Sequence, residues 1–251
     1  MSNVLQNALE RRRVLIGTIV SVNSCEQVEA LSASGLDWLF FDLEHAAFSV
    51  GDVQRMIQAV RPPCLSFIRI QEPEAAYVKK ALDTGCNGII VPQVNSAAAA
   101  RHIVEAGKYA PLGSRSVGLS RSTGYGANLA QAIASHNDEK SIIVQIEHAD
   151  AVKNLDEILS VPGVDGVFVG PYDLSASMGM IGQVGSAEVQ NAITLVAASA
   201  KKRNMISGIF IGTDAALEKE IGRGFQFIAV GSDILRAVAS CKATAEAAAK
   251  A

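Results

Sequence analysis

The chain is 251 residues long, 49% hydrophobic and 19% charged, with a formal net charge of -3 at pH 7. This composition is typical of a globular protein and gives no general electrostatic reason to bind nucleic acid or a membrane surface. The length suits one large α/β core, so we expect a single domain over residues 1–251 rather than two smaller ones.

Eight short runs rich in Val, Ile and Phe are too apolar to be half-exposed strands, and we predict that they form buried strands. These runs lie at 14–20, 38–43, 64–70, 88–93, 142–147, 166–170, 206–211 and 227–231. Stretches with helical spacing lie at 25–34, 51–60, 73–84, 96–107, 151–160, 186–203, 214–222 and 233 to about 249. Strict strand–helix alternation over eight units predicts one (β/α)8 barrel, with a helix at about 2–12 closing its bottom.

Several helix starts carry a polar residue that can cap them. Ser49, Ser96 and Asp214 each stand just before a predicted helix, and capping by such residues supports the direction of each strand-to-helix unit. The segment 108–140 is too long for a plain connection, so we expect a functional element or an interface element there. From Gly107 to Asn137 the charged residues are the cations Lys108, Arg115 and Arg121, which suit an anionic substrate, and the alternative is an ordered packing loop.

The cysteines Cys25, Cys64, Cys86 and Cys241 are widely spaced and form no C-x-x-C pair. Neither a zinc knuckle nor a disulfide framework is therefore expected. The N-terminus does not resemble a leader, and nowhere do eighteen apolar residues follow one another. We expect a cytoplasmic protein with reduced thiols.

Polar residues end four of the apolar runs, and in such barrels the active site lies at the carboxyl ends of the strands. They are Asp42, Glu44 and His45 after the second run, Arg69 in the third, Gln145, Glu147 and His148 in the fifth, and Gly170, Pro171 and Asp173 after the sixth. Strand alternation puts Gln145 and Glu147 on one face, and Asp42 and Glu44 on another shared face.

Burying several carboxylates together costs several kcal/mol for each unpaired charge, and a divalent cation would compensate that cost. Carboxylate ligands without cysteine suit Mg²⁺ or Mn²⁺, with Co²⁺ as a further candidate, and Glu147 and Asp173 are the predicted ligands. The alternative is that Glu147 pairs with Arg69 in a structural ion network. His45 alone fits a structural histidine as well as an acid–base group.

Two further features bear on the chemistry. Gly170 and Pro171 stop the sixth strand and leave backbone N–H groups near the mouth that can hold a carboxylate. No lysine ends any of the eight runs, which argues against a Schiff-base mechanism.

The chain closely resembles the class II pyruvate aldolases of the HpcH/HpaI type. The resemblance is carried by residues 35–46, Arg69, 91–94, 109–118 and above all 144–179. It implies a metal-dependent aldolase that reversibly cleaves a 4-hydroxy-2-oxo acid, such as 4-hydroxy-2-oxoheptanedioate or a 2-keto-3-deoxy sugar acid, to pyruvate and an aldehyde.

The resemblance also implies roles for particular residues. Glu147 and Asp173 would bind the metal, Gln145 would support it, and the backbone around Gly170 and Tyr172 would hold the pyruvate carboxylate. Arg69 would stabilise the developing enolate oxygen. His45, oriented by Asp83, would exchange the proton of the C4 hydroxyl, so the expected catalytic residues are His45, Arg69, Asp83 and Asp42, with Arg69, Gln145, Gly170, Pro171 and Tyr172 contacting substrate.

Residue 172 is Tyr, whereas a smaller Ala or Ser is common there in the family. The resemblance therefore does not identify the aldehyde that this chain uses.

The resemblance further implies a homohexamer, a trimer of dimers, in which the last helix is exchanged. Two other functions remain open: a citrate-lyase or malyl-coenzyme-A type of thioester lyase, and a barrel that binds small acids without turning them over.

Overall fold

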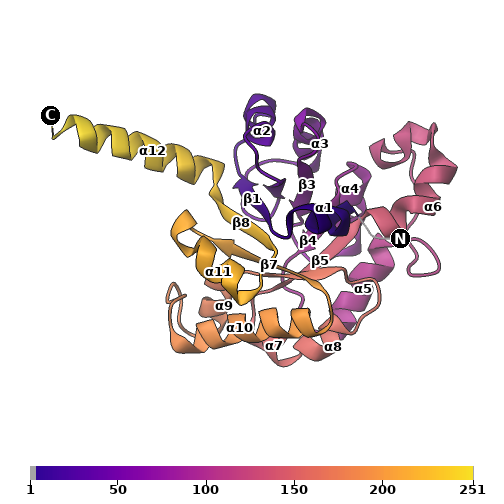
Figure 1. The fold of residues 1–251 in the computed structure, drawn as a ribbon. Coiled ribbons are helices and arrows are strands. Elements are labelled where there is room, and N and C mark those ends of the chain that lie inside the picture. Colours follow the sequence, from indigo (N-terminus) through magenta and orange to yellow (C-terminus); the bar gives the residue numbers. More distant parts are fainter. Residues whose placement is uncertain (1–3, 251) are drawn as a thin grey trace.

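The computed structural model describes residues 4–250 and shows eight parallel strands closed into a barrel in the order β1 to β8. The strands are β1 (Leu15–Val20), β2 (Trp38–Asp42), β3 (Leu65–Arg69), β4 (Gly88–Val91), β5 (Ser141–Ile146), β6 (Gly166–Val169), β7 (Ile206–Ile211) and β8 (Phe227–Ser232). All eight predicted runs are thus strands, and the predicted (β/α)8 barrel is confirmed (Figure 1).

Helices surround this barrel and cover most of its outer face (Figure 1). They are α1 (Val4–Arg12), α2 (Cys25–Ser32), α3 (Val50–Ala59), α4 (Ala75–Asp83), α5 (Ala97–Gly107), α6 (Leu129–Glu139), α7 (Ala149–Lys153), α8 (Leu155–Leu159), α9 (Pro171–Ser177), α10 (Ala187–Lys202), α11 (Leu217–Arg223) and α12 (Asp233–Ala248). Two 3-10 turns, η1 (Arg121–Gly126) and η2 (Asp214–Ala216), complete the elements. None of the helices within residues 4–250 is both long and apolar enough to cross a bilayer.

Two of the predicted helix caps form as expected and one does not. Ser49 makes a capping box with Asp52, and the Ser96 hydroxyl accepts from the N–H of Ala99. Asp214 lies inside η2, where Thr213 occupies the capping position, so the predicted Asp214 cap is wrong.

The segment 108–140 contains η1 and α6, neither of which its Gly-rich sequence predicts. The cations of this segment are engaged within the chain. Lys108 is buried and donates to the carbonyls of Asn137 and Lys140, and Arg121 donates to the carbonyl of Thr84. Because helix-to-strand connections lie at the amino ends of the strands, this segment packs at the end of the barrel opposite the mouth.

Inward-facing residues fill the lower barrel with aromatic rings, which we call the floor: Trp38, Phe40, Phe67, Phe168 and Phe227. The Trp38 ring stacks on Phe227 with 3.7 Å between centroids and meets Phe67 edge to face at 5.8 Å. Glycines on neighbouring strands make room, since a Cβ at Gly17 would lie 2.5 Å from the Trp38 ring and one at Gly208 2.5 Å from Phe168. Leu5 and Leu9 of α1 pack beneath this cluster and close the bottom as predicted.

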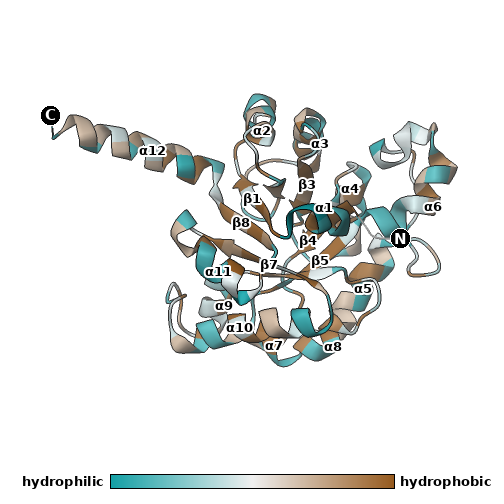
Figure 2. Cartoon of the chain, viewed as in Figure 1, coloured by the Kyte–Doolittle hydropathy of each residue, from teal (hydrophilic) through white to brown (hydrophobic). Residues whose placement is uncertain are grey.

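The outward faces of the same strands form a second apolar layer against the helices, and most of the strand ribbon is brown in Figure 2. Alternation therefore buries both faces of every strand, as a barrel requires. α12 is the exception among the covering helices. It projects away from the barrel (Figure 1), and Asp233 is the only one of its described residues that is buried.

Candidate active site

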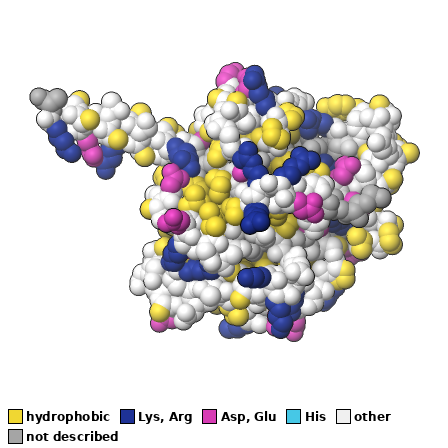
Figure 3. All heavy atoms as spheres, viewed as in Figure 1, with side chains coloured by type: hydrophobic (Ala, Val, Ile, Leu, Met, Phe, Trp, Pro, Cys, Tyr) yellow, Lys and Arg dark blue, Asp and Glu magenta, His cyan; other side chains and the backbone are white. Residues whose placement is uncertain are grey.

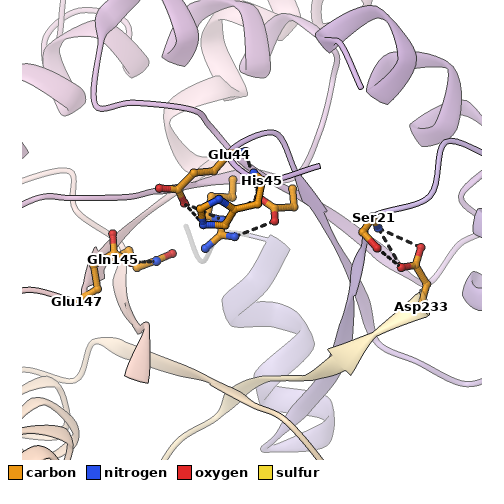
Figure 4. A network of polar contacts seen from close by, with 8 residues as sticks. Ser21, Glu44, His45, Gln145, Glu147 and Asp233 are labelled. Atoms are coloured by element: carbon orange, nitrogen blue, oxygen red, sulfur yellow. Dashed lines mark hydrogen bonds and ion pairs between the residues drawn. The ribbon is translucent and has the colours of Figure 1, made fainter. Parts of the chain in front are cut away.

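Polar side chains replace the aromatic rings at the carboxyl ends of β2, β3 and β5. Asp42, Arg69 and Gln145 continue the inward-facing rows that begin with Trp38, Leu65 and Ser141. Together with Glu147, they are buried, with at most 8% of each residue exposed. Figure 4 shows Glu44 and His45, which follow β2, on the same side of the barrel as Gln145 and Glu147 at the end of β5.

Arg69 is fixed by two carboxylates of the preceding strand and its loop. Its Nε and Nη2 donate to the two Asp42 oxygens at 2.9 and 2.8 Å, a bidentate pair favoured by their adjacent places in the β2–β3 register. The Glu44 Oε2 atom lies 3.1 Å from Arg69 Nε. The guanidinium also stands 5.3 Å from the centroid of the Phe40 ring, which joins the mouth to the floor.

His45 stands at the rim of the mouth, directly after this acidic pair. Its side chain is 64% exposed, and Nε2 lies 3.9 Å from Glu44 Oε2. The backbone N–H groups of Glu44 and His45 both donate to Asp42 Oδ1, at 3.1 and 3.3 Å. Asp42 therefore holds the loop that presents His45 as well as the Arg69 guanidinium.

Glu147 is held from two sides, and neither contact supplies a positive charge. The backbone N–H of Gln93 donates to Glu147 Oε1 at 2.8 Å, and the Gln145 amide donates to Oε2. The Gln145 Oε1 atom is buried and has no hydrogen-bond partner among the described residues. The predicted alternative is an ion pair between Glu147 and Arg69. Arg69 instead pairs with Asp42 and Glu44.

Burial and neighbouring charge shift the pKa values of the groups in the mouth. Burial raises the pKa of Glu147 above its usual value, against the hydrogen bonds from Gln93 and Gln145, and the charges of Glu44 and Asp173 add to the rise. Burial likewise raises the pKa of Glu44, although Arg69 opposes it. Burial disfavours charged Arg69, but hydrogen bonding and charge from Asp42 outweigh this and raise its pKa.

The end of β6 and the first turn of α9 complete the site. Pro171 is the first residue of α9, where its missing N–H costs nothing, and this placement brings Tyr172 and Asp173 to the mouth. The Gly170 N–H donates to the Ile146 carbonyl at 3.3 Å, so it is engaged within the barrel. Tyr172 lies in the first turn, whose N–H groups have no acceptor within the helix.

A cavity of about 130 Å³ opens between these elements. Both charged or amide groups and apolar rings line it. The lining residues are Ile19, Phe40, His45, Arg69, Gln145, Phe168, Gly170, Pro171, Tyr172, Asp173 and Phe210. Its volume is well below the roughly 300–1,000 Å³ of pockets for drug-sized ligands, so the cavity suits a small molecule.

The mouth fits a divalent cation held by few protein ligands. No group of three or more His, Cys, Asp or Glu side chains within residues 4–250 is arranged to hold a metal by itself. The charges of Glu44 and Asp173 nevertheless add to the raised pKa of buried Glu147, whose hydrogen bonds come from the neutral Gln93 N–H and Gln145 amide. A carboxylate-only donor set completed by water is what Mg²⁺ or Mn²⁺ accepts.

Asp83 does not join the other expected catalytic residues within the chain. It ends α4, which leads to the amino end of β4, so it lies at the end of the barrel opposite the mouth. Its carboxylate accepts hydrogen bonds from Arg115 at 2.6 Å and from Ser120 at 3.2 Å. The predicted contact between Asp83 and His45 is therefore not made within one chain.

Sequence reasoning left three residues out of the expected site. Glu44 was a strand-end residue without a role, although it is the acid beside both Arg69 and His45. Gln93 acts through its backbone, which no side-chain pattern reveals, at a φ of 54°. Phe210 lines the cavity from the end of β7, and its place as an inward-facing residue at a strand end was the available signal.

A second polar contact on the rim joins β1 to α12, at the right of Figure 4. The Asp233 carboxylate accepts from the N–H groups of Ser21 and Val22 at 3.0 Å each, and from the Ser21 hydroxyl at 2.6 Å. Ser232, not Asp233, supplies the cap of α12. Asp233 thus anchors the start of α12 to the loop after β1.

Comparison with known proteins connects this site to characterised relatives. The sequence model described as HpcH/HpaI aldolase/citrate lyase matches residues 16–239. A 2-keto-3-deoxy-L-rhamnonate aldolase of Klebsiella pneumoniae is 36% identical over 94% of this chain and 89% of its own length. A 4-hydroxy-2-oxo-heptane-1,7-dioate aldolase of Escherichia coli is 37% identical over 93% and 90%. A solved HpcH/HpaI family structure from Burkholderia cenocepacia superposes with a TM-score of 0.93 at 30% identity, covering 98% of this chain and 99% of that one.

Proposed function

Because the chain belongs to the HpcH/HpaI aldolase/citrate lyase family and is a pyruvate aldolase, we propose that Glu147 and Asp173 hold its divalent metal. The observation that carries this proposal is the charge of the mouth. Among the described residues, Glu147 is buried with Gln93 and Gln145 as its hydrogen-bond partners, and Asp173 lines the neighbouring cavity. A cation bound there would supply the missing counter-charge, and Mg²⁺ or Mn²⁺ is the proposed ion.

The reaction is the reversible cleavage of the C3–C4 bond of a 4-hydroxy-2-oxo acid, which gives pyruvate and an aldehyde. The metal, when bound, supplies an electron sink at the 2-oxo group by acting as a Lewis acid. Everything else in the mouth positions the substrate or moves a proton.

Arg69 stabilises the enolate oxygen that develops as the bond breaks. Asp42 occupies its Nε and Nη2 atoms, so the guanidinium is oriented before substrate arrives and presents its remaining N–H groups to the cavity. A donor fixed in this way needs no reorganisation during the reaction, which is how preorganised charge lowers a barrier.

His45 takes the proton of the C4 hydroxyl during cleavage and returns it during condensation. It lines the cavity and is exposed enough to exchange that proton with water. Glu44, 3.9 Å away, is the acid that stands beside its imidazole within this chain. We give Asp83 no role in orienting His45 inside one chain, because its carboxylate binds Arg115 and Ser120.

The decisive experiment measures pyruvate release from a panel of 4-hydroxy-2-oxo acids by coupling to lactate dehydrogenase. Protein stripped with EDTA is assayed before and after addition of Mg²⁺ or Mn²⁺, beside Glu147→Gln. We expect the metal to restore activity in the wild type, and kcat/KM to fall about a thousandfold or more in the variant, since Lewis-acid catalysis contributes several kcal/mol. Full activity in metal-free protein, or in the variant, would contradict the proposed ligands.

Two further measurements separate the remaining alternatives. A thioester lyase would condense acetyl-coenzyme A with glyoxylate, yet a cavity of about 130 Å³ offers little room beyond a small acid. Metal binding without turnover of any substrate would leave a small-acid binder as the function.

We further propose that the protein assembles as a homohexamer, a trimer of dimers. The support within the chain is α12, which exposes Ile234, Leu235 and Val238 at 51%, 51% and 59%. Figure 3 shows hydrophobic atoms gathered on the barrel beside α11 and the base of α12. Exposed apolar area of this kind commonly marks a contact between proteins. Light scattering at several concentrations measures the mass and would contradict the proposal by giving a monomer throughout.

The compartment that we propose is the cytoplasm. All four cysteines are free thiols, and Cys64 and Cys86 are buried. Burial and the nearby charge of Asp37 raise the pKa of Cys64 to about 12, so its thiol is unreactive. Such thiols persist in a reducing compartment.

A further inference from the structure

The cavity has a second wall whose chemistry the proposed mechanism does not use. Ile19, Phe40, Phe168, Phe210 and Tyr172 contribute apolar atoms to its lining, with Phe40 beneath the Arg69 guanidinium. The Tyr172 and Phe210 rings stand 6.3 Å apart between centroids, tilted by 53°. We call these two residues the aromatic rim.

Tyr172 is placed by the same turn that places the proposed metal ligand. It directly precedes Asp173 in the first turn of α9, so one turn fixes the backbone position of both residues. The Tyr172 hydroxyl reaches the β7 end, where a Cβ at Gly212 would lie 3.7 Å from it. The ring therefore spans the gap between β6 and β7, with half of it open to solvent at 51% exposure.

We propose that the aromatic rim restricts the aldehyde partner of the aldol reaction to short, uncharged aldehydes. This inference rests on the proposed function and names the substrate class for the same site. Pyruvate must take the side near Arg69, Gln145 and Asp173, because its carboxylate and oxo group need polar partners. The aldehyde substituent then points to the aromatic rim, where the cavity of about 130 Å³ leaves room for few further atoms.

Charge along this wall also disfavours an acidic aldehyde. Arg69 is the one Arg or Lys side chain in the described lining, and the N–H groups that Asp42 leaves free are the ones proposed to contact the enolate oxygen. Arg236, near the start of α12, is a further guanidinium at the carboxyl end of β8, and it contacts the Val230 carbonyl at 3.2 Å and Asp214 at 3.4 Å. A distal carboxylate would be desolvated against apolar rings without a ready partner, which costs more than an uncharged chain end.

The bond chemistry is that of an ordinary aldol condensation. The methyl carbon of pyruvate loses a proton and forms the new bond to the aldehyde carbonyl carbon, whose oxygen gains a proton as it becomes the C4 hydroxyl. No oxidant or reductant is required. The aromatic rim contacts only the substituent on the aldehyde, so it sets specificity without taking part in proton transfer.

The test compares kcat/KM for condensation of pyruvate with acetaldehyde, butanal and succinic semialdehyde. The last two have four carbons each and differ in the terminal carboxylate. We expect the wild type to favour acetaldehyde, then butanal, then succinic semialdehyde. Tyr172→Ala should raise the ratio of butanal to acetaldehyde about tenfold or more, since pocket contacts with one or two methylenes discriminate by about that factor. Tyr172→Phe, the matched control that keeps the ring, should leave the ratio within about twofold.

Two outcomes would overturn the inference. One is a wild-type preference for succinic semialdehyde that Arg236→Met abolishes, which would identify Arg236 as a carboxylate site. The other is an unchanged butanal ratio in both Tyr172→Ala and Phe210→Ala, provided that each variant remains folded by circular dichroism.

Exchange of the pyruvate methyl protons with D₂O, followed by NMR without any aldehyde, separates this inference from the proposed function. Methyl exchange depends on the metal and Arg69 but not on the aldehyde. Exchange that is absent from the wild type would overturn the proposed function. If exchange persists but Tyr172→Ala and Phe210→Ala leave the aldehyde preference unchanged, only the restriction on aldehydes is overturned.

Discussion

Phe67 and Arg69 leave β3 on the same side, two residues apart, and they belong to opposite ends of the barrel interior. The floor around Phe67 is made of stacked rings that need no partner beyond one another. The mouth around Arg69 is made of charges, each of which depends on a particular neighbour. The floor therefore stabilises the folded state, whereas the buried charged groups of the mouth reduce stability and serve the reaction.

The largest effect is expected in the floor. Trp38→Ala removes the ring that stacks on Phe227 and leaves a cavity, so the free energy of unfolding should fall by about 3–5 kcal/mol. Urea denaturation measures the loss. The exposed Leu195→Ala is the control, and it should change stability by no more than about 0.5 kcal/mol. Wild-type stability in Trp38→Ala would contradict the claim that the floor stabilises the folded state.

Substitutions in the mouth should change activity more than stability. Arg69→Met removes the donor aimed at the enolate oxygen, and kcat should fall about 10²–10³-fold, as when one oxyanion donor is lost. Steady-state assay of pyruvate release gives kcat and KM separately. Arg69→Lys keeps the charge without the bidentate contact to Asp42 and should recover only part of the loss. Equal activity of the lysine and wild-type enzymes would show that orientation by Asp42 is dispensable.

A smaller effect, an increase in the free energy of unfolding, is expected for one substitution in the mouth. In metal-free protein at pH 8, Glu147→Gln removes a buried carboxylate whose hydrogen bonds come from neutral groups, so stability should rise by about 0.5–2 kcal/mol. Denaturation in EDTA measures the change. Excess Mg²⁺ or Mn²⁺ should reverse the ranking, because only the wild type gains stability by binding the ion at this site. A less stable variant in EDTA would mean that the carboxylate already has a stabilising partner.

The smallest expected effect is a slope in the pH dependence of stability. Burial raises the pKa of Glu147 and of Glu44 in the folded state above the unfolded value of about 4.5. The folded state therefore holds its protons longer, and the stability from these groups is present below pH 4.5 and lost as pH rises through the raised values. Denaturation midpoints of metal-free protein at pH 4.5, 6 and 8 should fall more steeply for the wild type than for Glu147→Gln. Parallel curves would show that Glu147 titrates as if in water.

Much of this comparison could be predicted from strand alternation. Once eight apolar runs are strands, the rows that contain Asp42, Arg69 and Gln145 must point inward at the carboxyl ends, and the structure brings these residues together there. Only short-range geometry and a known barrel topology are needed for that step.

The remaining features depend on contacts that a linear pattern does not contain. Family likeness groups Asp83 with His45, although a residue that ends a helix before a strand belongs to the far end of the barrel. The Gly-rich surroundings of α6 hide its helical pattern, and Pro171 resembles the end of a strand although it starts α9. The hold of Gln93 on Glu147 comes from the backbone, so no residue type marks it.

The anchor between Asp233 and the loop after β1 has a consequence for α12. The helix is fastened at one end, and its remaining 15 residues lie exposed to water. A helix of that length has little order of its own in water, because starting a helix costs more than a few turns return. If partner chains supply the contacts that the barrel does not, the helicity of α12 becomes a matter of mass action: dilution unwinds it while the barrel stays folded.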